Sequence, residues 1–146
     1  MISSIAVILM SEHDQQVTVV KWFELQYPKY APLLISYPSG AILGSNIRSR
    51  CKTAQRNAIA GQVRKLKKEG WRTGIPDLFL AVPRGEYAGL WLEMKDEGKT
   101  LCSVSKEQRA YIEAFNEVGY AATWCAGSDA AIDVISRYME GQYCND

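Results

Sequence analysis

The stretch GIPDLFLAVPRGEYAGLWLEMKD, residues 74–96, decides the fold of this chain. Two apolar runs, residues 78–82 and 90–95, flank the turn-forming stretch PRGEYAG, and this pattern predicts a β-hairpin. Charges interrupt the pattern, because Asp77 stands where the first strand begins and Glu93 lies inside the second. A charge that is shielded from water costs free energy unless something compensates it. These residues therefore lie at a solvated edge or meet a charged ligand.

The second strand divides its side chains between two faces, because alternate residues of a strand point in opposite directions. The face expected to pack on a core carries Leu90, Leu92 and Met94, and the opposite face carries Trp91, Glu93 and Lys95. A hairpin brings the start of one strand close to the end of the next. Asp77 and Glu93 are therefore expected to share a ligand, with Lys95 beside them.

Two carboxylates beside a lysine suit metal-assisted hydrolysis of a phosphodiester. A hard cation such as Mg²⁺ prefers oxygen ligands and usually takes only one or two protein carboxylates, so that a substrate phosphate and waters complete its coordination. The metal polarises the phosphoryl oxygen, while a lysine orients the attacking water or stabilises developing negative charge. A structural alternative is open at this point: Asp77 caps a turn, and Glu93 forms a cross-strand ion pair with Lys95.

The length of 146 residues favours one domain, residues 1–146, with a substantial core. Residues 1–10 include an apolar run that is too short to span a bilayer and has no basic leading region, so we expect no membrane association. This segment is either an extra edge strand or a leader, if translation begins at Met10. The scattered cysteines and the single His13 lack the spacing of a zinc site or a disulfide framework. We therefore expect free thiols and a cytoplasmic protein.

Charge is unevenly distributed along the chain, although the formal net charge is only +1. One segment holds nine basic residues and a single acid, Glu69, which leaves eight basic and fifteen acidic residues elsewhere. The basic residues are Arg48, Arg50, Lys52, Arg56, Arg64, Lys65, Lys67, Lys68 and Arg72. A basic segment on a mildly acidic body points to a polyanionic partner on one face. For a charge run alone, a solvated helix face is the more common explanation.

Local signals before the hairpin predict two helices. The first begins after Ser11, a good N-cap residue, and is stopped by Pro28. A short strand is expected at residues 33–37. The second helix is the basic segment, residues 49–69, and it ends at Gly70, a residue typical of the position after a helix.

Local signals after the hairpin predict a helix, a strand and a final helix. The first of these helices has Ser105 as its N-cap and Gln108 three residues later, which is a capping box. Residues 121–126, AATWCA, form a strand, and Ser128 is expected to cap the last helix. The complete order predicts an α/β fold in which a small mixed β-sheet is flanked by helices.

The ordered motifs resemble a known nuclease family. Pro76-Asp77 followed by Glu93-Met94-Lys95 resembles the core of PD-(D/E)XK nucleases, and more narrowly the virus-type replication-repair nuclease domain, VRR-NUC, in its stand-alone phage form. Further matches are an opening helix with Glu12 and Gln16, basic residues before a Gly-x-Pro-Asp, SKEQ at the start of the helix after the hairpin, and a Gly-Tyr step into a short strand. The resemblance covers nearly the whole chain and implies a restriction-endonuclease-like core.

This resemblance implies a role for each matching residue. Asp77 and Glu93 match the family's metal ligands, the main-chain carbonyl of Met94 matches a further ligand, and Lys95 matches the catalytic lysine. Glu12 matches the opening-helix glutamate, which contacts the metal directly or through water. The implied cofactor is Mg²⁺ or Mn²⁺, with no small-molecule cofactor.

Two glutamines and a second glutamate have competing interpretations. Gln108 matches the family's helix glutamine, which supports the lysine or the nucleophile, but it also completes the capping box; both can hold at once. Gln16 is either a site residue or a helix-surface residue. Glu24 competes with Glu12 for the metal role, and we favour an exposed glutamate there. The chain departs from the family where Pro38-Ser39-Gly40 replaces a Pro-Asn-Gly-like stretch.

In this setting the basic segment is expected to contact DNA phosphates without reading sequence. Trp71 could stack on a splayed base, although a core position is more common for a tryptophan. The resemblance implies a homodimeric, metal-dependent endodeoxyribonuclease that cuts branched DNA such as four-way (Holliday) junctions in DNA repair. A flap-directed or restriction-like nuclease on the same fold is one alternative, and a catalytically silent DNA-binding protein is another. A phage-encoded protein would act in the cytoplasm of its host cell.

Overall fold

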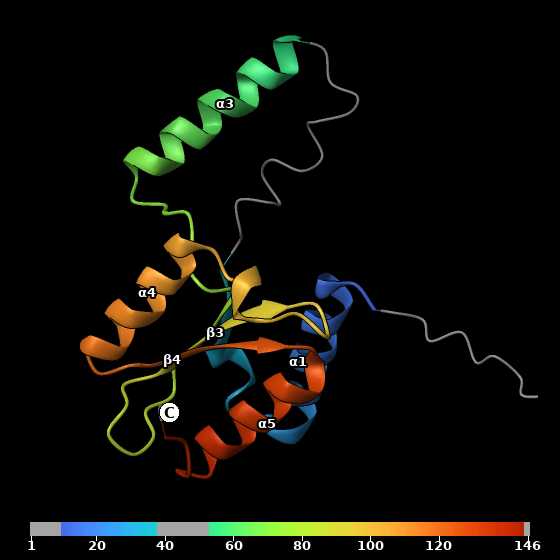
Figure 1. The fold of residues 1–146 in the computed structure, drawn as a ribbon, viewed down its shortest axis with the longest axis vertical. Coiled ribbons are helices and arrows are strands. Elements are labelled where there is room, and N and C mark those ends of the chain that lie inside the picture. Colours follow the sequence, from blue (N-terminus) through green and yellow to red (C-terminus); the bar gives the residue numbers. More distant parts are fainter. Residues whose placement is uncertain (1–9, 38–52, 145–146) are drawn as a thin grey trace, which may run out of the picture.

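The computed structural model describes residues 10–37 and 53–144, with the side chains of residues 53–58 left out (Figure 1). Several predictions fall outside these residues: the strand or leader at residues 1–10 (apart from Met10), the Pro38-Ser39-Gly40 stretch, and the contacts of Arg48, Arg50 and Lys52. The side chain of Arg56 is also outside them.

The chain forms one small mixed sheet with helices on both faces, as the sequence predicts (Figure 1). The strands are β1 (Leu34–Ser36), β2 (Leu78–Leu80), β3 (Leu90–Lys95) and β4 (Ala121–Ala126), and they lie side by side in that order. The β1–β2 and β2–β3 pairs are antiparallel, whereas β3 and β4 are parallel. A parallel pair requires a crossover, and α4 (Lys106–Glu117) supplies it. The hairpin prediction is confirmed, with a first strand shorter than expected.

The aliphatic core lies between the sheet and two helices, α1 (Glu12–Gln26) and α5 (Ser128–Met139). The α1 side chains Val19 and Phe23 are fully buried, as are Ile135 and Tyr138 of α5. The strands contribute Leu78, Leu80, Leu90, Leu92 and Met94. The predicted core face of β3 is therefore confirmed.

The opposite face of the sheet is covered by α4 and packed with aromatic rings. Trp91 stacks on Phe79 of β2 at 4.4 Å between ring centroids and on Phe115 of α4 at 4.6 Å. Tyr120 meets both phenylalanines edge to face. Since Trp91 and Glu93 lie on the same side of β3, this aromatic layer borders the charged end of the strand.

The predicted helix starts are confirmed at two of three positions. Ser11 and Ser105 cap α1 and α4 through capping boxes with Asp14 and Gln108. The assignment of Ser128 as a cap is wrong, because Ser128 is the first helical residue and Gly127 precedes it as the N-cap, without a side-chain cap bond. Gly127 has φ +90°, a conformation that favours glycine, and its N–H donates to the Lys95 carbonyl at 2.9 Å. The end of β3 therefore sets where α5 begins.

The basic helix α3 (Thr53–Lys68) extends away from the sheet and its covering helices (Figure 1). Gly70, at φ +103°, follows it as the sequence predicts. Within residues 10–37 and 53–144, no helix is both long and apolar enough to cross a membrane. Cys102, Cys125 and Cys144 are free thiols.

Candidate active site at the charged end of the hairpin

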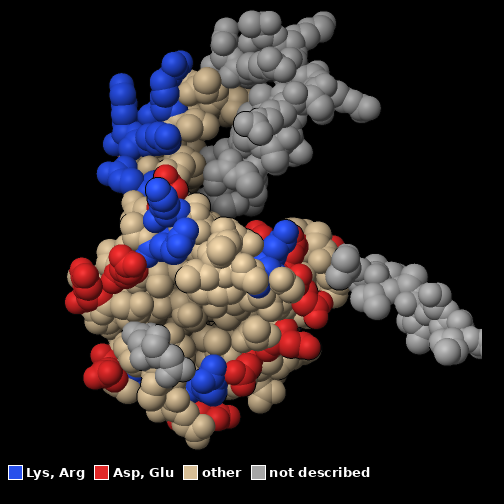
Figure 2. Space-filling model, in the orientation of Figure 1, with Lys and Arg blue, Asp and Glu red and all other residues tan. Residues whose placement is uncertain are grey.

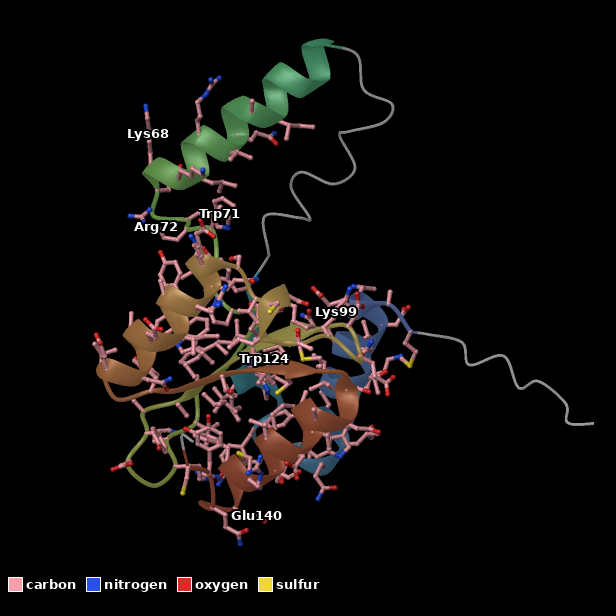
Figure 3. The ribbon with its side chains drawn as sticks, in the orientation of Figure 1. Lys68, Trp71, Arg72, Lys99, Trp124 and Glu140 are labelled. Atoms are coloured by element: carbon pink, nitrogen blue, oxygen red, sulfur yellow. The ribbon has the colours of Figure 1, made fainter. Side chains whose placement is uncertain are left out.

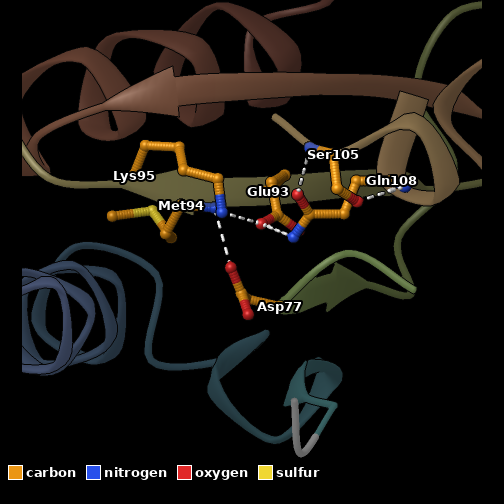
Figure 4. Close-up of polar contacts among 6 residues, drawn as sticks. All are labelled: Asp77, Glu93, Met94, Lys95, Ser105 and Gln108. Atoms are coloured by element: carbon orange, nitrogen blue, oxygen red, sulfur yellow. Dashed lines mark hydrogen bonds and ion pairs between the residues drawn. The ribbon is translucent and has the colours of Figure 1, made fainter. Parts of the chain in front are cut away.

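Asp77 joins the two strands of the hairpin at the end where the charges meet. It is only 7% exposed and directly precedes β2, after the buried Pro76. Its carboxylate oxygen Oδ2 accepts a hydrogen bond from the main-chain N–H of Met94 at 2.9 Å (Figure 4). This bond holds Asp77 beside the Glu93-Met94-Lys95 segment, so the hairpin brings these residues together.

Glu93 is the most buried of the charged residues, with 1% of its surface exposed. Its oxygen Oε1 accepts hydrogen bonds from two donors, Lys95 Nζ and Gln108 Nε2 (Figure 4). Its other oxygen, Oε2, is buried without a hydrogen-bond partner among the described residues. A buried carboxylate oxygen with no donor is costly, and such groups commonly belong to a catalytic or ion-binding site.

Burial raises the pKa values of all three acids, and neighbouring carboxylates add to this effect at Glu93 and Glu12. Burial, reinforced by the charges of Asp77 and Glu12, raises the pKa of Glu93 to about 7 despite the bond from Lys95. Burial also raises the pKa of Asp77, although the Met94 N–H and Lys95 oppose it. The pKa of Glu12 is raised by burial and by Asp77 and Asp96, against Lys95. A cation bound among these acids would relieve the repulsion that they share.

The positive charge of Lys95 acts on all three acids and lowers the pKa of each. Burial would lower its pKa, but the hydrogen bond to Glu93 and the charges of the surrounding carboxylates outweigh this effect and raise it. Lys95 is therefore protonated at neutral pH. It can act as a positive charge or as a hydrogen-bond donor, and it is not suited to act as a general base.

The raised pKa of Glu93 predicts a pH-dependent stability of the metal-free protein. Below about pH 4.5 Glu93 is protonated in both states, and between 4.5 and about 7 only the folded state keeps the proton. The free energy of unfolding should therefore fall as pH rises through this window, by up to about 3 kcal/mol, and level off above it. Urea unfolding of the wild type and Glu93→Gln in chelator measures this. Identical pH dependence in both proteins would contradict the assignment.

Gln108 unites the two interpretations that the sequence left open. Its side-chain oxygen Oε1 accepts a hydrogen bond from the main-chain N–H of Ser105 at 2.8 Å, and the main-chain N–H of Gln108 donates to Ser105 Oγ at 3.1 Å. These two bonds complete the capping box. Its Nε2 simultaneously donates to Glu93. The same side chain therefore caps α4 and contacts the carboxylate, so the N-terminus of α4 faces the site.

Gly74 has a role that sequence analysis missed, although the Gly-x-Pro-Asp motif contains it. Its φ is +86°, and a Cβ atom at this position would lie 2.8 Å from Glu107 Cβ and 3.2 Å from the Gln108 nitrogen. The loop that carries Asp77 therefore packs directly on the first turn of α4. The absence of a side chain at residue 74 allows both sides of the site to approach.

We expect Gly74→Ala to lower the free energy of unfolding by about 2 kcal/mol or more, because it adds a left-handed alanine and a clash with α4. The matched control is Gly98→Ala, where φ is +79° but nothing lies within 4 Å of the added Cβ. The loss in the free energy of unfolding of this control should come only from placing an alanine in a left-handed backbone conformation. Urea denaturation of both variants gives the comparison, and equal losses would show that the contact with α4 carries no energy.

The three residues of α1 that the sequence singles out, Glu12, Gln16 and Glu24, have different surroundings. Glu12 lies close enough for its charge to act on Asp77 and Lys95. Gln16 Nε2 donates to Ser36 Oγ at 3.1 Å and so ties α1 to β1. Glu24 is exposed, in agreement with our preference for Glu12. The buried α1 residue Gln15, which the sequence did not single out, donates to the Met10 carbonyl at 3.0 Å.

The acids fit a metal that takes few protein ligands. Within the described residues, no three His, Cys, Asp or Glu side chains converge as a complete metal cage. Asp77 and Glu93 nevertheless supply neighbouring carboxylates, and Glu93 Oε2 has no donor in the part of the chain that the structure describes. Mg²⁺ and Mn²⁺ suit such a site, since they use one or two carboxylates together with substrate oxygens and water. The role of Glu12 as a further ligand stays a prediction.

Basic side chains gather on α3 and just beyond it, whereas acidic side chains are spread over the body (Figure 2). Arg64, Lys65, Lys67 and Lys68 are exposed on the helix, and Arg72 is exposed after it. Lys68 and Arg72 extend outward from this end of the molecule (Figure 3). Lys65 Nζ lies 3.8 Å from a carboxylate oxygen of Glu69, the residue that directly follows the helix. Trp71 is half-buried, so it is not freely available for stacking.

Comparisons with known proteins agree with this geometry. The family model described as "VRR-NUC domain" matches residues 10–129. A solved structure described as "VRR_NUC domain protein" superposes with a TM-score of 0.68 at 25% sequence identity, and the match covers 90% of each chain. No curated protein matches the chain significantly.

Proposed function

The chain belongs to the VRR-NUC family and is a nuclease of the PD-(D/E)XK type. On this basis we propose that it is a Mg²⁺- or Mn²⁺-dependent endodeoxyribonuclease that cuts branched DNA as a homodimer. The observation that carries the catalytic part of this proposal is the state of Glu93. This carboxylate is buried beside Asp77 and accepts a hydrogen bond from Lys95 with one oxygen, while its other oxygen has no donor among residues 10–37 and 53–144.

In the proposed mechanism, the carboxylates of Asp77 and Glu93 would hold the metal, with the main-chain carbonyl of Met94 and with Glu12 as further ligands. The chemistry that Mg²⁺ or Mn²⁺ would supply there is polarisation of the phosphoryl oxygen and acidification of a water molecule. The positive charge of Lys95 stabilises the negative charge that develops on the phosphate, or the lysine orients the attacking water. Gln108 keeps the Glu93 carboxylate in place through its amide group.

DNA is proposed to bind across the basic face of α3 and the segment that follows it. The proposed phosphate contacts among the described side chains are Arg64, Lys65, Lys67, Lys68 and Arg72, and Arg48, Arg50, Lys52 and Arg56 are proposed as further phosphate contacts. Exposed lysines and arginines on a projecting helix neutralise phosphates and carry no information on base identity. The substrate is therefore selected by its shape.

Neutralising α3 is expected to weaken DNA binding and its dependence on salt. In a variant with Arg64, Lys65, Lys67 and Lys68 changed to Gln, the slope of log K against log salt concentration should become shallower by about 0.9 for each phosphate contact that is lost. The control is Lys21→Gln/Lys29→Gln, which removes two exposed lysines of α1 and the following turn. Fluorescence anisotropy at several salt concentrations measures the slope, and an unchanged slope would remove α3 from the interface.

The preferred substrate is proposed to be the four-way junction. A two-fold symmetric dimer would present two sites to the two strands of such a junction. A flap-directed or restriction-like nuclease is the second candidate, since the same catalytic groups would serve it.

The test incubates purified protein with labelled four-way junction, flap and linear duplex, in Mg²⁺, in Mn²⁺ and in chelator. Paired, metal-dependent cuts near the junction are expected. Equal cutting of every duplex would leave a nuclease of the restriction-like kind, and preferred cutting of the flap would favour the flap-directed alternative. Binding without any cleavage would mean a catalytically silent DNA-binding protein.

A further inference from the structure

The Gln108 side chain is held at both of its polar ends, by the N-cap residue of α4 and by Glu93 of β3. The Ser105 main-chain N–H donates to Gln108 Oε1 at 2.8 Å, and Gln108 Nε2 donates to Glu93 Oε1 (Figure 4). A glutamine amide has one acceptor group and one donor group, and here each group has a partner that only it can satisfy.

The reverse orientation of this amide is strongly disfavoured. Turning it over would place the NH₂ group of Gln108 against the Ser105 N–H and its oxygen against the Glu93 carboxylate. Both new contacts would be repulsive, because the first joins two donors and the second joins two acceptors. The Ser105 N–H therefore decides which end of Gln108 faces Glu93.

The locked amide also determines which oxygen of Glu93 is open. Lys95 and Gln108 both donate to Oε1, whereas Oε2 has no partner within the part of the chain that the structure describes. Lys95 lies on the same strand as Glu93, while Gln108 approaches from a different element. Gln108 thus fixes the carboxylate relative to α4 and, through the contact of Gly74 with Glu107, relative to the loop before Asp77.

We propose that Ser105 is a positioning residue of this site: its main-chain N–H locks the Gln108 amide so that Glu93 presents Oε2 to the metal. The inference rests on the proposed nuclease function and adds a residue that touches neither metal nor DNA. It assigns the effect to the main chain of Ser105 and not to its hydroxyl group, which caps the helix separately.

Two substitutions at Ser105 separate these roles. Ser105→Ala removes the hydroxyl cap and keeps the N–H, whereas Ser105→Pro removes both. Proline fits locally, because Ser105 has φ −64° and the preceding Val104 has φ −85° and ψ 120°, the region allowed before proline. The difference between the two variants therefore reports the loss of this N–H, together with the displacement of Gln108 Oε1 by the proline ring carbon that takes its place.

Mg²⁺ and Mn²⁺ affinities measured by calorimetry, together with junction cleavage in saturating metal, are the readouts. Relative to Ser105→Ala, Ser105→Pro should bind metal on the order of tenfold more weakly, as is typical when the partner that orients a metal ligand is lost. Its Gln108 side-chain amide protons should also lose protection from exchange in NMR spectra. Equal metal affinity and equal amide protection in both folded variants would overturn the inference.

One measurement needs no proline variant. The Ser105 N–H lies at an exposed helix start, yet in the wild type it should exchange slowly, and Gln108→Met should make that exchange fast. Fast exchange in the wild type would overturn the inference even where Ser105→Pro does not fold. A wild type that binds no metal and cuts no DNA would instead overturn the proposed function, while the exchange data would still report on the lock.

Discussion

Glu93→Gln should abolish metal-dependent DNA cleavage, with a fall in rate of about three orders of magnitude or more. The substitution keeps the size of the side chain and removes the charge that would hold the metal. It also replaces the bare Oε2 by an amide or carbonyl group, which is a poorer metal ligand. Junction cleavage in Mg²⁺ and calorimetric Mg²⁺ titration should therefore fail together.

The same variant should not be less stable than the wild type in chelator at pH 8. Glu93 is only 1% exposed, and its pKa of about 7 means that it is ionised at pH 8. The raised pKa reflects the free-energy cost of holding this charge in a buried position. Removing this charge removes the cost, so loss of activity cannot be explained by unfolding. Glu113→Gln, at an exposed position on α4, is the matched control and should cleave normally. Full activity in Glu93→Gln would remove Glu93 from the site.

Lys95→Met is the second variant with a large expected effect, and its signature differs from that of Glu93→Gln. Cleavage should fall by about a hundredfold to a thousandfold, because the charge that stabilises the developing negative charge is lost. Metal affinity should be retained or increased, since a positive charge beside the Glu93 carboxylate has gone. The two activities, binding and cleavage, are thereby separated in one protein.

Lys99→Met provides the comparison, because Lys99 is an exposed lysine shortly after β3 (Figure 3). Assays of both variants need saturating Mg²⁺, since without metal Lys95→Met leaves the three acids with no cation among them and is expected to be less stable. A wild-type cleavage rate in Lys95→Met would exclude a catalytic role. A parallel loss of metal binding would indicate that Lys95 organises the carboxylates instead.

Several features of the fold were predictable because their causes are local. The turn-forming residues between two apolar runs predicted the hairpin. The alternation of side chains along β3 separated Leu92 and Met94 from Glu93 and Lys95. The serines before α1 and α4 marked the starts of these helices. Pro76-Asp77 and Glu93-Met94-Lys95 indicated both the site and the family, and the family is confirmed.

Other features depend on contacts between distant segments, which no local pattern encodes. Glu93 is buried because α4 covers its face of the sheet and Gln108 reaches it from that helix. Gly127, and not Ser128, is the N-cap of α5, and its N–H donates to the end of β3. Gly74 must lack a side chain because Glu107, far along the chain, lies against it.

By itself, then, the sequence determined which residues are the candidates for the chemistry, since residue type and spacing along one hairpin are properties of the chain. Only the tertiary structure decided the state of those residues. The pKa of Glu93 and the orientation of its two oxygens follow from burial and from donors on other elements. Desolvation and hydrogen bonding depend on what surrounds a group in space, and packing of β3 against α4 creates those surroundings.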